Sequence, residues 1–127
     1  MFKILVIEED IERQHILRSV LTANRYEVID SADPGIVWIK LIAQEKMPDL
    51  ILCSYPQDGL AEFLQKKHRE KTTRSIPIIF LMKEEVKSNR EELERGPKHN
   101  YWYYTPIPFN PLSLLKKIDE IMALATR

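Results

Sequence analysis

Three consecutive acidic residues, Glu8, Glu9 and Asp10, directly follow the first apolar run of the chain, Ile4–Ile7. Hard divalent cations such as Mg²⁺ bind carboxylate oxygens, and an Asp at the start of a helix accepts hydrogen bonds from the free N–H groups of the first turn. The cluster therefore predicts an acidic pocket in which Glu8 and Glu9 are weak metal candidates. The alternative is a solvated acidic rim in which Asp10 caps the next helix.

Three further apolar runs end on side chains with little chemistry of their own. Ser54 ends the run after Pro48, Met82 ends the run from Ile76, and Ile107 follows an aromatic run. A serine hydroxyl is a poor nucleophile without an adjacent base. A thioether and an alkyl chain carry no charge and donate no hydrogen bond to an oxyanion. None of these three side chains is therefore expected to be reactive on its own.

The other reactive residue types form no recognisable site. His15, His68 and His99 share no spacing typical of metal ligands, and the chain has only three glycines, which leaves no Gly-rich loop for a phosphate. The single cysteine, Cys53, lies inside an apolar run. That placement fits a small buried side chain in a reducing compartment, and a lone cysteine excludes an internal disulfide.

Length and composition fit one globular domain over residues 1–127, with 44% hydrophobic and 30% charged residues. Lys+Arg and Asp+Glu are equal at 19 each, so the overall charge attracts neither nucleic acid nor an anionic membrane. No apolar stretch reaches the roughly 18 residues that span a bilayer. The strand pattern begins almost at the N-terminus, which leaves no room for a signal peptide. We expect a cytoplasmic protein without a cofactor.

The apolar runs are continuous rather than alternating, as in strands buried on both faces of a parallel sheet. The expected strands are Ile4–Ile7, Tyr26–Ile29, Leu50–Cys53, Ile76–Met82 and Tyr101–Thr105. The expected helices run from Asp10 to Asn24, from Pro34 through Ile42, from Leu60 to His68, from Glu84 to Arg95 and from Pro111 onward. This alternation predicts a flavodoxin-like α/β fold, a doubly wound five-stranded parallel sheet in the order 2-1-3-4-5 with helices on both faces.

The runs Lys3–Asp10, Pro48–Ser54, Ile76–Met82 and Tyr101–Phe109, taken in this order, resemble the receiver domain of two-component response regulators. The resemblance covers nearly the whole chain. It implies a site at the carboxyl ends of the strands, where two acidic residues bind Mg²⁺ and an aspartate accepts a phosphoryl group from a histidine kinase. At the next two strand ends, a Ser or Thr and a Lys contact the phosphoryl oxygens.

Matched by position, this chain keeps the acidic pair as Glu8 and Glu9, but its phosphorylation site is degenerate. Ser54 falls on the acceptor, Met82 on the hydroxyl and Ile107 on the lysine. Phosphoryl transfer needs an in-line nucleophile, a bridging cation and fixed positive charge. We therefore expect a phosphorylation-independent (pseudo-receiver) signalling module, not an enzyme, that acts by protein–protein interaction. The resemblance also implies a cis peptide bond before Pro108.

Two alternatives stay open. A conventional phosphoryl-accepting receiver would need another acceptor, either Asp58 in the loop before Gly59 or phosphoserine at Ser54. A small flavodoxin-like enzyme or nucleotide binder would need a phosphate loop or convergent polar groups, and the sequence contains neither.

Four consecutive aromatic residues, Tyr101, Trp102, Tyr103 and Tyr104, form the expected last strand. Tyr104 matches the switch aromatic of receivers. Alternate side chains of a strand face opposite sides, so two of the rings must point away from one side of the sheet. We expect this strand, the helix Glu84–Arg95 and the last helix to form a face for a protein partner or a homodimer. The alternative is that the rings pack under the helices.

Overall fold

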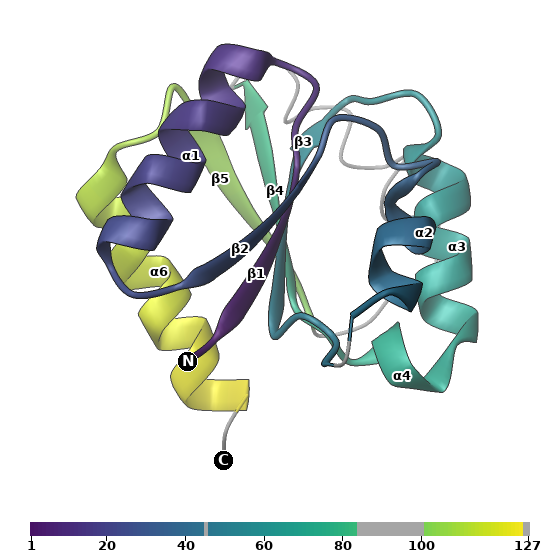
Figure 1. Cartoon of the computed structure of the whole chain (residues 1–127). Coiled ribbons are helices and arrows are strands. Elements are labelled where there is room, and N and C mark those ends of the chain that lie inside the picture. The colour runs from purple at the N-terminus through teal and green to yellow at the C-terminus, as the bar shows by residue number, and fades with distance from the viewer. Residues whose placement is uncertain (45, 84–100, 126–127) are drawn as a thin grey trace.

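The computed structural model describes residues 1–44, 46–83 and 101–125, which form one parallel sheet with helices on both faces (Figure 1). The strands are β1 (Lys3–Ile7), β2 (Glu27–Ser31), β3 (Leu50–Tyr55), β4 (Ile78–Lys83) and β5 (Trp102–Ile107). They pair in the order β2-β1-β3-β4-β5, which confirms the predicted fold class and strand order. In such a sheet the ligand crevice lies at the carboxyl ends of the strands, where the strand order reverses.

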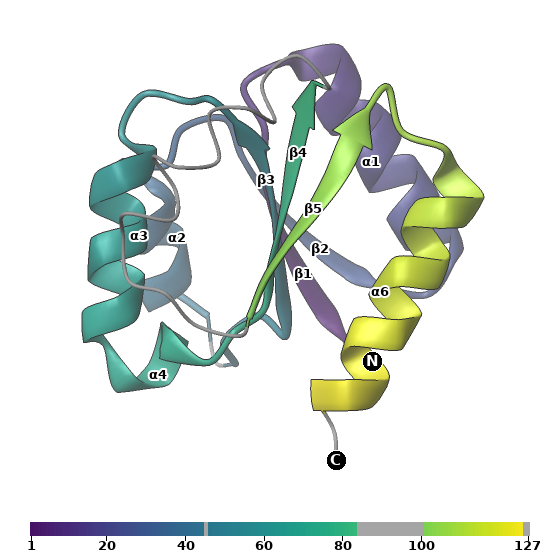
Figure 2. The same ribbon diagram turned by 180° about the vertical axis from the view of Figure 1, so that it is seen from behind.

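Helices α1 (Ile11–Ala23) and α6 (Pro111–Ala125) cover one face of the sheet, and α2 (Val37–Ile42) and α3 (Leu60–Arg69) cover the other (Figure 1, Figure 2). Both views show α1 and α6 side by side on the same face. A single helical turn, α4 (Lys71–Arg74), follows α3 and was not predicted from the sequence. The expected helix Glu84–Arg95 lies outside the described residues.

Helix α2 begins later than the sequence suggested, since Pro34 lies in a turn rather than in the first helical turn. The Asp33 carboxylate accepts a hydrogen bond from the Gly35 N–H at 2.7 Å. Side-chain bonds of this kind offer the backbone an alternative to the helix. The helical hydrogen-bond pattern therefore starts only at Val37.

The core consists of two apolar layers, one on each face of the sheet. Alternate residues of β1 contribute to each layer: Leu5 and Ile7 pack against α2 and α3, and Ile4 and Val6 pack against α1 and α6. All four side chains are buried, which explains why the run is continuously apolar. Phe63 of α3 is among the largest side chains of the first layer.

The corner between α3 and α4 buries a lysine, Lys67, of which only 1% is exposed. Its Nζ donates a hydrogen bond to the Arg74 carbonyl at 3.2 Å, and the Thr73 hydroxyl donates to the Lys67 carbonyl at 2.9 Å. No carboxylate pairs with Lys67 in the described part of the chain. Burial without a counter-ion lowers the pKa of this lysine to about 8.

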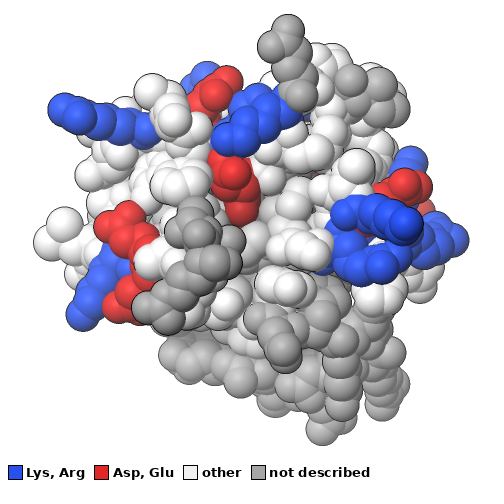
Figure 3. All heavy atoms as spheres, turned by 90° about the horizontal axis from the view of Figure 1, so that it is seen from below, with Lys and Arg blue, Asp and Glu red and all other residues white. Residues whose placement is uncertain are grey.

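Figure 3 shows the molecule from the end opposite the site, where positive and negative side chains lie close together. Several Lys and Arg side chains gather at the right of this view, with acidic side chains next to them. Among the described residues, no helix is both long and apolar enough to span a membrane.

Candidate functional site

Glu8 and Ser54 are the polar side chains buried at the carboxyl ends of the central strands. The register pairs Ile7 with Cys53, so the next residues, Glu8 and Ser54, are neighbours across β1 and β3. Glu8 is 1% exposed and Ser54 is 5% exposed. A buried carboxylate is strongly destabilising unless it is paired and hydrogen-bonded, so the partners of Glu8 define the chemistry of this site.

The first turn of α1 supplies the partners of Glu8. Arg13 Nη1 lies 3.2 Å from Glu8 Oε1, and the Asp10 N–H donates to the same oxygen at 3.0 Å. Gln14 also donates to the Glu8 carbonyl at 3.3 Å. The second carboxylate oxygen, Oε2, is buried without a hydrogen-bond partner. The sequence analysis identified Glu8 but missed Arg13, its counter-ion.

The other two acidic residues of the cluster face solvent. Glu9 and Asp10 are both exposed. Asp10 is the N-cap of α1, and its Oδ1 accepts a hydrogen bond from the Arg13 N–H at 3.0 Å. The predicted capping role of Asp10 is therefore confirmed. The three acids occupy consecutive positions but do not converge on one point, because only Glu8 is directed into the fold.

Gln57 connects the two strand ends and was not identified from the sequence. Its Nε2 donates to the Ser54 carbonyl at 2.8 Å and to the Ile7 carbonyl at 3.0 Å. Its own carbonyl oxygen and the Ser54 hydroxyl are both buried without a partner. Beneath them lies Cys53, whose thiol pKa is raised by burial and, secondarily, by the charge of Glu8. This thiol stays protonated and has no nucleophilic role.

Met82 and Ile107, the other two positions that the sequence predicts to be degenerate, lie on different sides of the sheet. Met82 is fully buried in the layer under α2 and α3. Ile107 is half-buried next to the layer under α1 and α6. The register pairs Ile107 with Lys83, the residue after Met82. A lysine therefore lies beside the position where the family resemblance implies one, although on the neighbouring strand.

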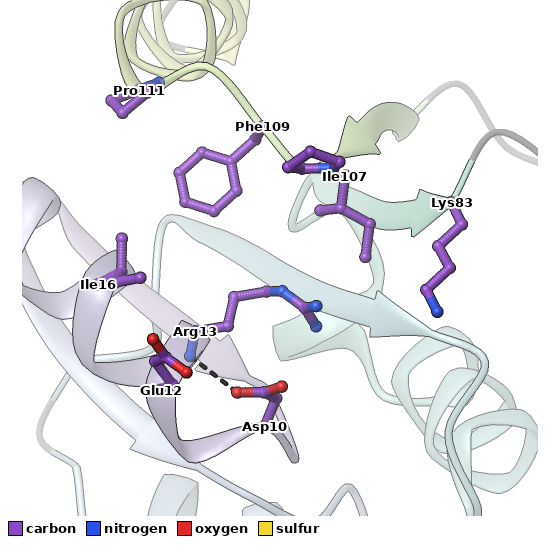
Figure 4. Close-up of a pocket in the computed structure, with 9 residues that line it drawn as sticks. Asp10, Glu12, Arg13, Ile16, Lys83, Ile107, Phe109 and Pro111 are labelled. Atoms are coloured by element: carbon purple, nitrogen blue, oxygen red, sulfur yellow. Dashed lines mark hydrogen bonds between the residues drawn. The ribbon is translucent and has the colours of Figure 1, made fainter.

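Lys83, Ile107 and Arg13 line an open pocket of about 590 Å³ between the start of α1 and the loop after β5 (Figure 4). Figure 4 shows the Arg13 side chain extending between Asp10 and Ile107, with Lys83 on the far side. The remaining lining residues are Glu12, Ile16, Pro108, Phe109 and Pro111. Charges of both signs line this pocket above an apolar wall. The Ile107–Pro108 peptide bond is cis, as predicted, and so is Tyr55–Pro56.

The donor set does not fit a divalent cation, which the family resemblance implies at this place. Mg²⁺ is usually bound by one or two carboxylates together with other oxygens. Here one carboxylate, Glu8, is buried and already paired with Arg13, and the neighbouring strand offers a serine hydroxyl. Within residues 1–44, 46–83 and 101–125, no group of three or more His, Cys, Asp or Glu side chains could hold a metal.

The aromatic residues of β5 pack on both faces of the sheet. Phe80 contacts Trp102 edge-to-face, with ring centroids 5.5 Å apart, and stacks on Tyr104 at 5.7 Å. Tyr103 packs against the layer on the opposite face. All three rings are half-buried, and Tyr101, just before the strand, is the most exposed of the four at 39%.

Comparison with known proteins gives one consistent result, although no family model matches the chain. The phosphate regulon transcriptional regulatory protein PhoB of Escherichia coli (strain K12) is 28% identical over 122 residues, 94% of this chain and 51% of that protein. PhoB of Klebsiella pneumoniae gives the same identity and coverage. The chain therefore spans about half the length of the curated relatives it matches.

Among solved structures, the chemotaxis response regulator CheY4 of Vibrio cholerae superposes with a TM-score of 0.79 at 24% identity, covering 95% of this chain and 98% of that one. The receiver domain of the sensor histidine kinase PA1611 from Pseudomonas aeruginosa, which has a magnesium ion in its active site cleft, gives 0.77 at 21% identity, with 96% and 98% covered. These structures share the fold. The sequence likeness to PhoB and the fold shared with these receiver structures agree with the resemblance to response regulator receiver domains.

Proposed function

We propose that this receiver domain signals without accepting a phosphoryl group and acts through protein–protein contacts. The observation that carries the proposal is Ser54, which stands at the acceptor position. Its hydroxyl is buried and has no hydrogen-bond partner among the described residues, which supply no base to activate it. In the following loop, the Gln57 amide donates to the Ser54 carbonyl rather than accepting a proton.

The remaining site residues support the same function. Phosphoryl transfer needs a cation that bridges the phosphoryl oxygens and fixed positive charge near them. Met82 is packed in the core and Ile107 is an alkyl side chain, so neither contacts a phosphoryl group through a polar atom. The Glu8 carboxylate, on which a bridging cation would depend, is paired with Arg13.

Asp58 is a poor replacement for the missing acceptor. It is exposed and directly precedes Gly59, whose φ of 83° makes it the left-handed residue at the start of α3. Asp and Gly at these positions are typical of a turn. A side chain on this outer loop lacks the buried, in-line placement that a phosphoryl acceptor needs.

The partner surface that we propose is the face of β5 and α6. β5 lies at one edge of the described sheet, and edge strands are the part of a sheet that most readily adds another chain. Tyr101 presents an exposed ring there, and Tyr and Trp are enriched in protein interfaces. We propose a protein of the same signalling pathway, or a second copy of this chain, as the partner, with no nucleic acid bound by this domain.

Acetyl phosphate with Mg²⁺ tests the absence of phosphoryl transfer. We expect the intact mass to stay unchanged, while a receiver with an aspartate acceptor, treated in parallel, gains one phosphoryl group. A stable gain on this chain would contradict the proposal. Loss of that gain in Asp58→Asn, with retention in Ser54→Ala, would identify Asp58 as the acceptor.

A further inference from the structure

The ion pair between Glu8 and Arg13 differs from most surface ion pairs because its carboxylate is buried and its guanidinium is mostly covered. Glu8 is 1% exposed, and the Arg13 side chain is 29% exposed. The backbone of Arg13 is itself fixed, because its N–H donates to Asp10, the N-cap of α1. The guanidinium therefore reaches back from an ordered helical turn to a carboxylate at the end of β1.

We propose that Arg13 is the resident cation of this receiver and takes the place of a divalent metal ion at the acidic site. The inference concerns charge balance at Glu8. It does not depend on the proposed absence of phosphoryl transfer, since a receiver phosphorylated at Asp58 would still carry this ion pair.

The charges at the site favour one monovalent cation. Among the described residues, Glu8 is the buried carboxylate of the site, and the Arg13 guanidinium balances its charge. A divalent ion at Glu8 would lie beside that guanidinium, which itself lines a pocket together with Lys83. Glu9 is exposed and Asp10 is engaged by α1, so neither adds a compensating charge.

The oxygens near Glu8 indicate what Arg13 excludes. Glu8 Oε2, the Ser54 hydroxyl and the Gln57 carbonyl oxygen are all buried without a partner. Glu8 follows β1, Ser54 lies near the end of β3, and Gln57 lies in the loop after β3. The Gln57 amide connects these segments because it donates hydrogen bonds to the Ile7 and Ser54 carbonyls. Hard cations take carboxylate, hydroxyl and amide oxygens. Without the guanidinium, these groups would form an uncompensated, oxygen-rich site, so Arg13→Met should create a response to Mg²⁺ that the native chain lacks.

The experiment compares melting temperatures in EDTA and in millimolar Mg²⁺ at pH 8 for the native chain, Arg13→Met and Arg13→Lys. Arg18→Met is the matched control. Arg18 lies on the same helix as Arg13, but its ion pair, with Asp30 of β2 at 2.6 Å, is outside the site. In EDTA we expect Arg13→Met to melt roughly 5 to 10 °C below the native chain, since it leaves a buried carboxylate unpaired. Mg²⁺ should restore most of this loss, whereas Arg13→Lys keeps a cation and should not respond.

A second measurement locates the ion. Mn²⁺ broadens the NMR signals of nearby amides, and the Asp10 N–H, which donates to Glu8 Oε1, reports on this site. We expect selective broadening of the Asp10 signal in Arg13→Met only. Selective broadening in the native chain would overturn the proposal. The proposal would also be overturned if Arg13→Met had the same melting temperature in EDTA as the Arg18→Met control, or if Mg²⁺ did not raise the melting temperature of Arg13→Met.

Discussion

The buried lysine Lys67 makes the stability of this domain depend on pH in an unusual direction. In the folded chain the pKa of Lys67 is lowered to about 8, from 10.5 for an unperturbed lysine, because its ammonium is desolvated between α3 and α4. Between these two values Lys67 binds more protons in the unfolded chain than in the folded chain. Its contribution to the free energy of unfolding therefore rises with pH in this window.

Two pKa values 2.5 units apart give a large effect. For the step from pH 8 to pH 10, linkage predicts that Lys67 increases the free energy of unfolding by about 2 kcal/mol. The buried Cys53 thiol offsets part of this gain, because burial raises its pKa above the ordinary value of 9.0 and the thiol therefore ionises in this range only in the unfolded chain. Above pH 10 another group also opposes the gain. Burial and the hydrogen bond to Asp119 raise the pKa of Tyr26, so stability is lost once unfolded tyrosine ionises. The measurement belongs between pH 8 and pH 10.

Urea unfolding followed by tryptophan fluorescence over this range is the assay, with Lys67→Met as the test variant. We expect the native chain to gain about 2 kcal/mol relative to Lys67→Met between pH 8 and pH 10, because the Cys53 contribution is common to both proteins. Lys116→Met is the control, since Lys116 is an exposed residue of α6, and it should keep the native slope. A difference in stability between the native chain and Lys67→Met that stays constant over this range would refute the reasoning.

Three further predictions concern the site, the edge strand and the long-range contact of α6. Gln57→Leu removes the donor to the Ile7 and Ser54 carbonyls and should destabilise the domain by about 1–3 kcal/mol in urea unfolding. An unchanged urea midpoint would mean that these two hydrogen bonds do not stabilise the fold. Tyr101→Glu should weaken association, measured by sedimentation velocity, while the melting temperature stays nearly constant, and a strictly monomeric native chain would contradict the proposed face. Tyr26→Phe removes the hydroxyl that donates to Asp119 at 2.6 Å and should reduce the loss of stability above pH 10 in urea unfolding, and an unchanged loss would contradict this assignment.

The fold was predictable because each strand is a continuous apolar run. Strands buried on both faces need apolar residues at every position, and Ile4–Ile7 has them, so the order of the elements and the parallel sheet followed directly. Element ends were less predictable. The Asp33 turn delays α2, and the polar sequence of α4 (Lys71–Arg74) has no apolar periodicity that could reveal a helix.

The candidate site was predictable in its positions but not in its contacts. Glu8 and Ser54 were placed correctly, since carboxyl ends of parallel strands meet at one edge of the sheet. Which partner a buried carboxylate takes depends on the conformation of long side chains. Nothing in the local pattern distinguishes Arg13 from other charged residues of α1, and Gln57 appeared as an ordinary loop residue. Met82 lies on the opposite face because of strand pleating.

The central position of β1 has a consequence for synthesis on the ribosome. β1 ends at Ile7, but β3, its neighbour on one side, begins only at Leu50. At about 5–20 residues per second, translation of the roughly 40 intervening residues takes about 2 to 9 s. β2 emerges before β3 and pairs with the other edge of β1, but a unit of two strands is at best marginally stable. For several seconds a strand that is fully buried in the finished domain is therefore exposed, and we expect chaperones to bind it on the nascent chain.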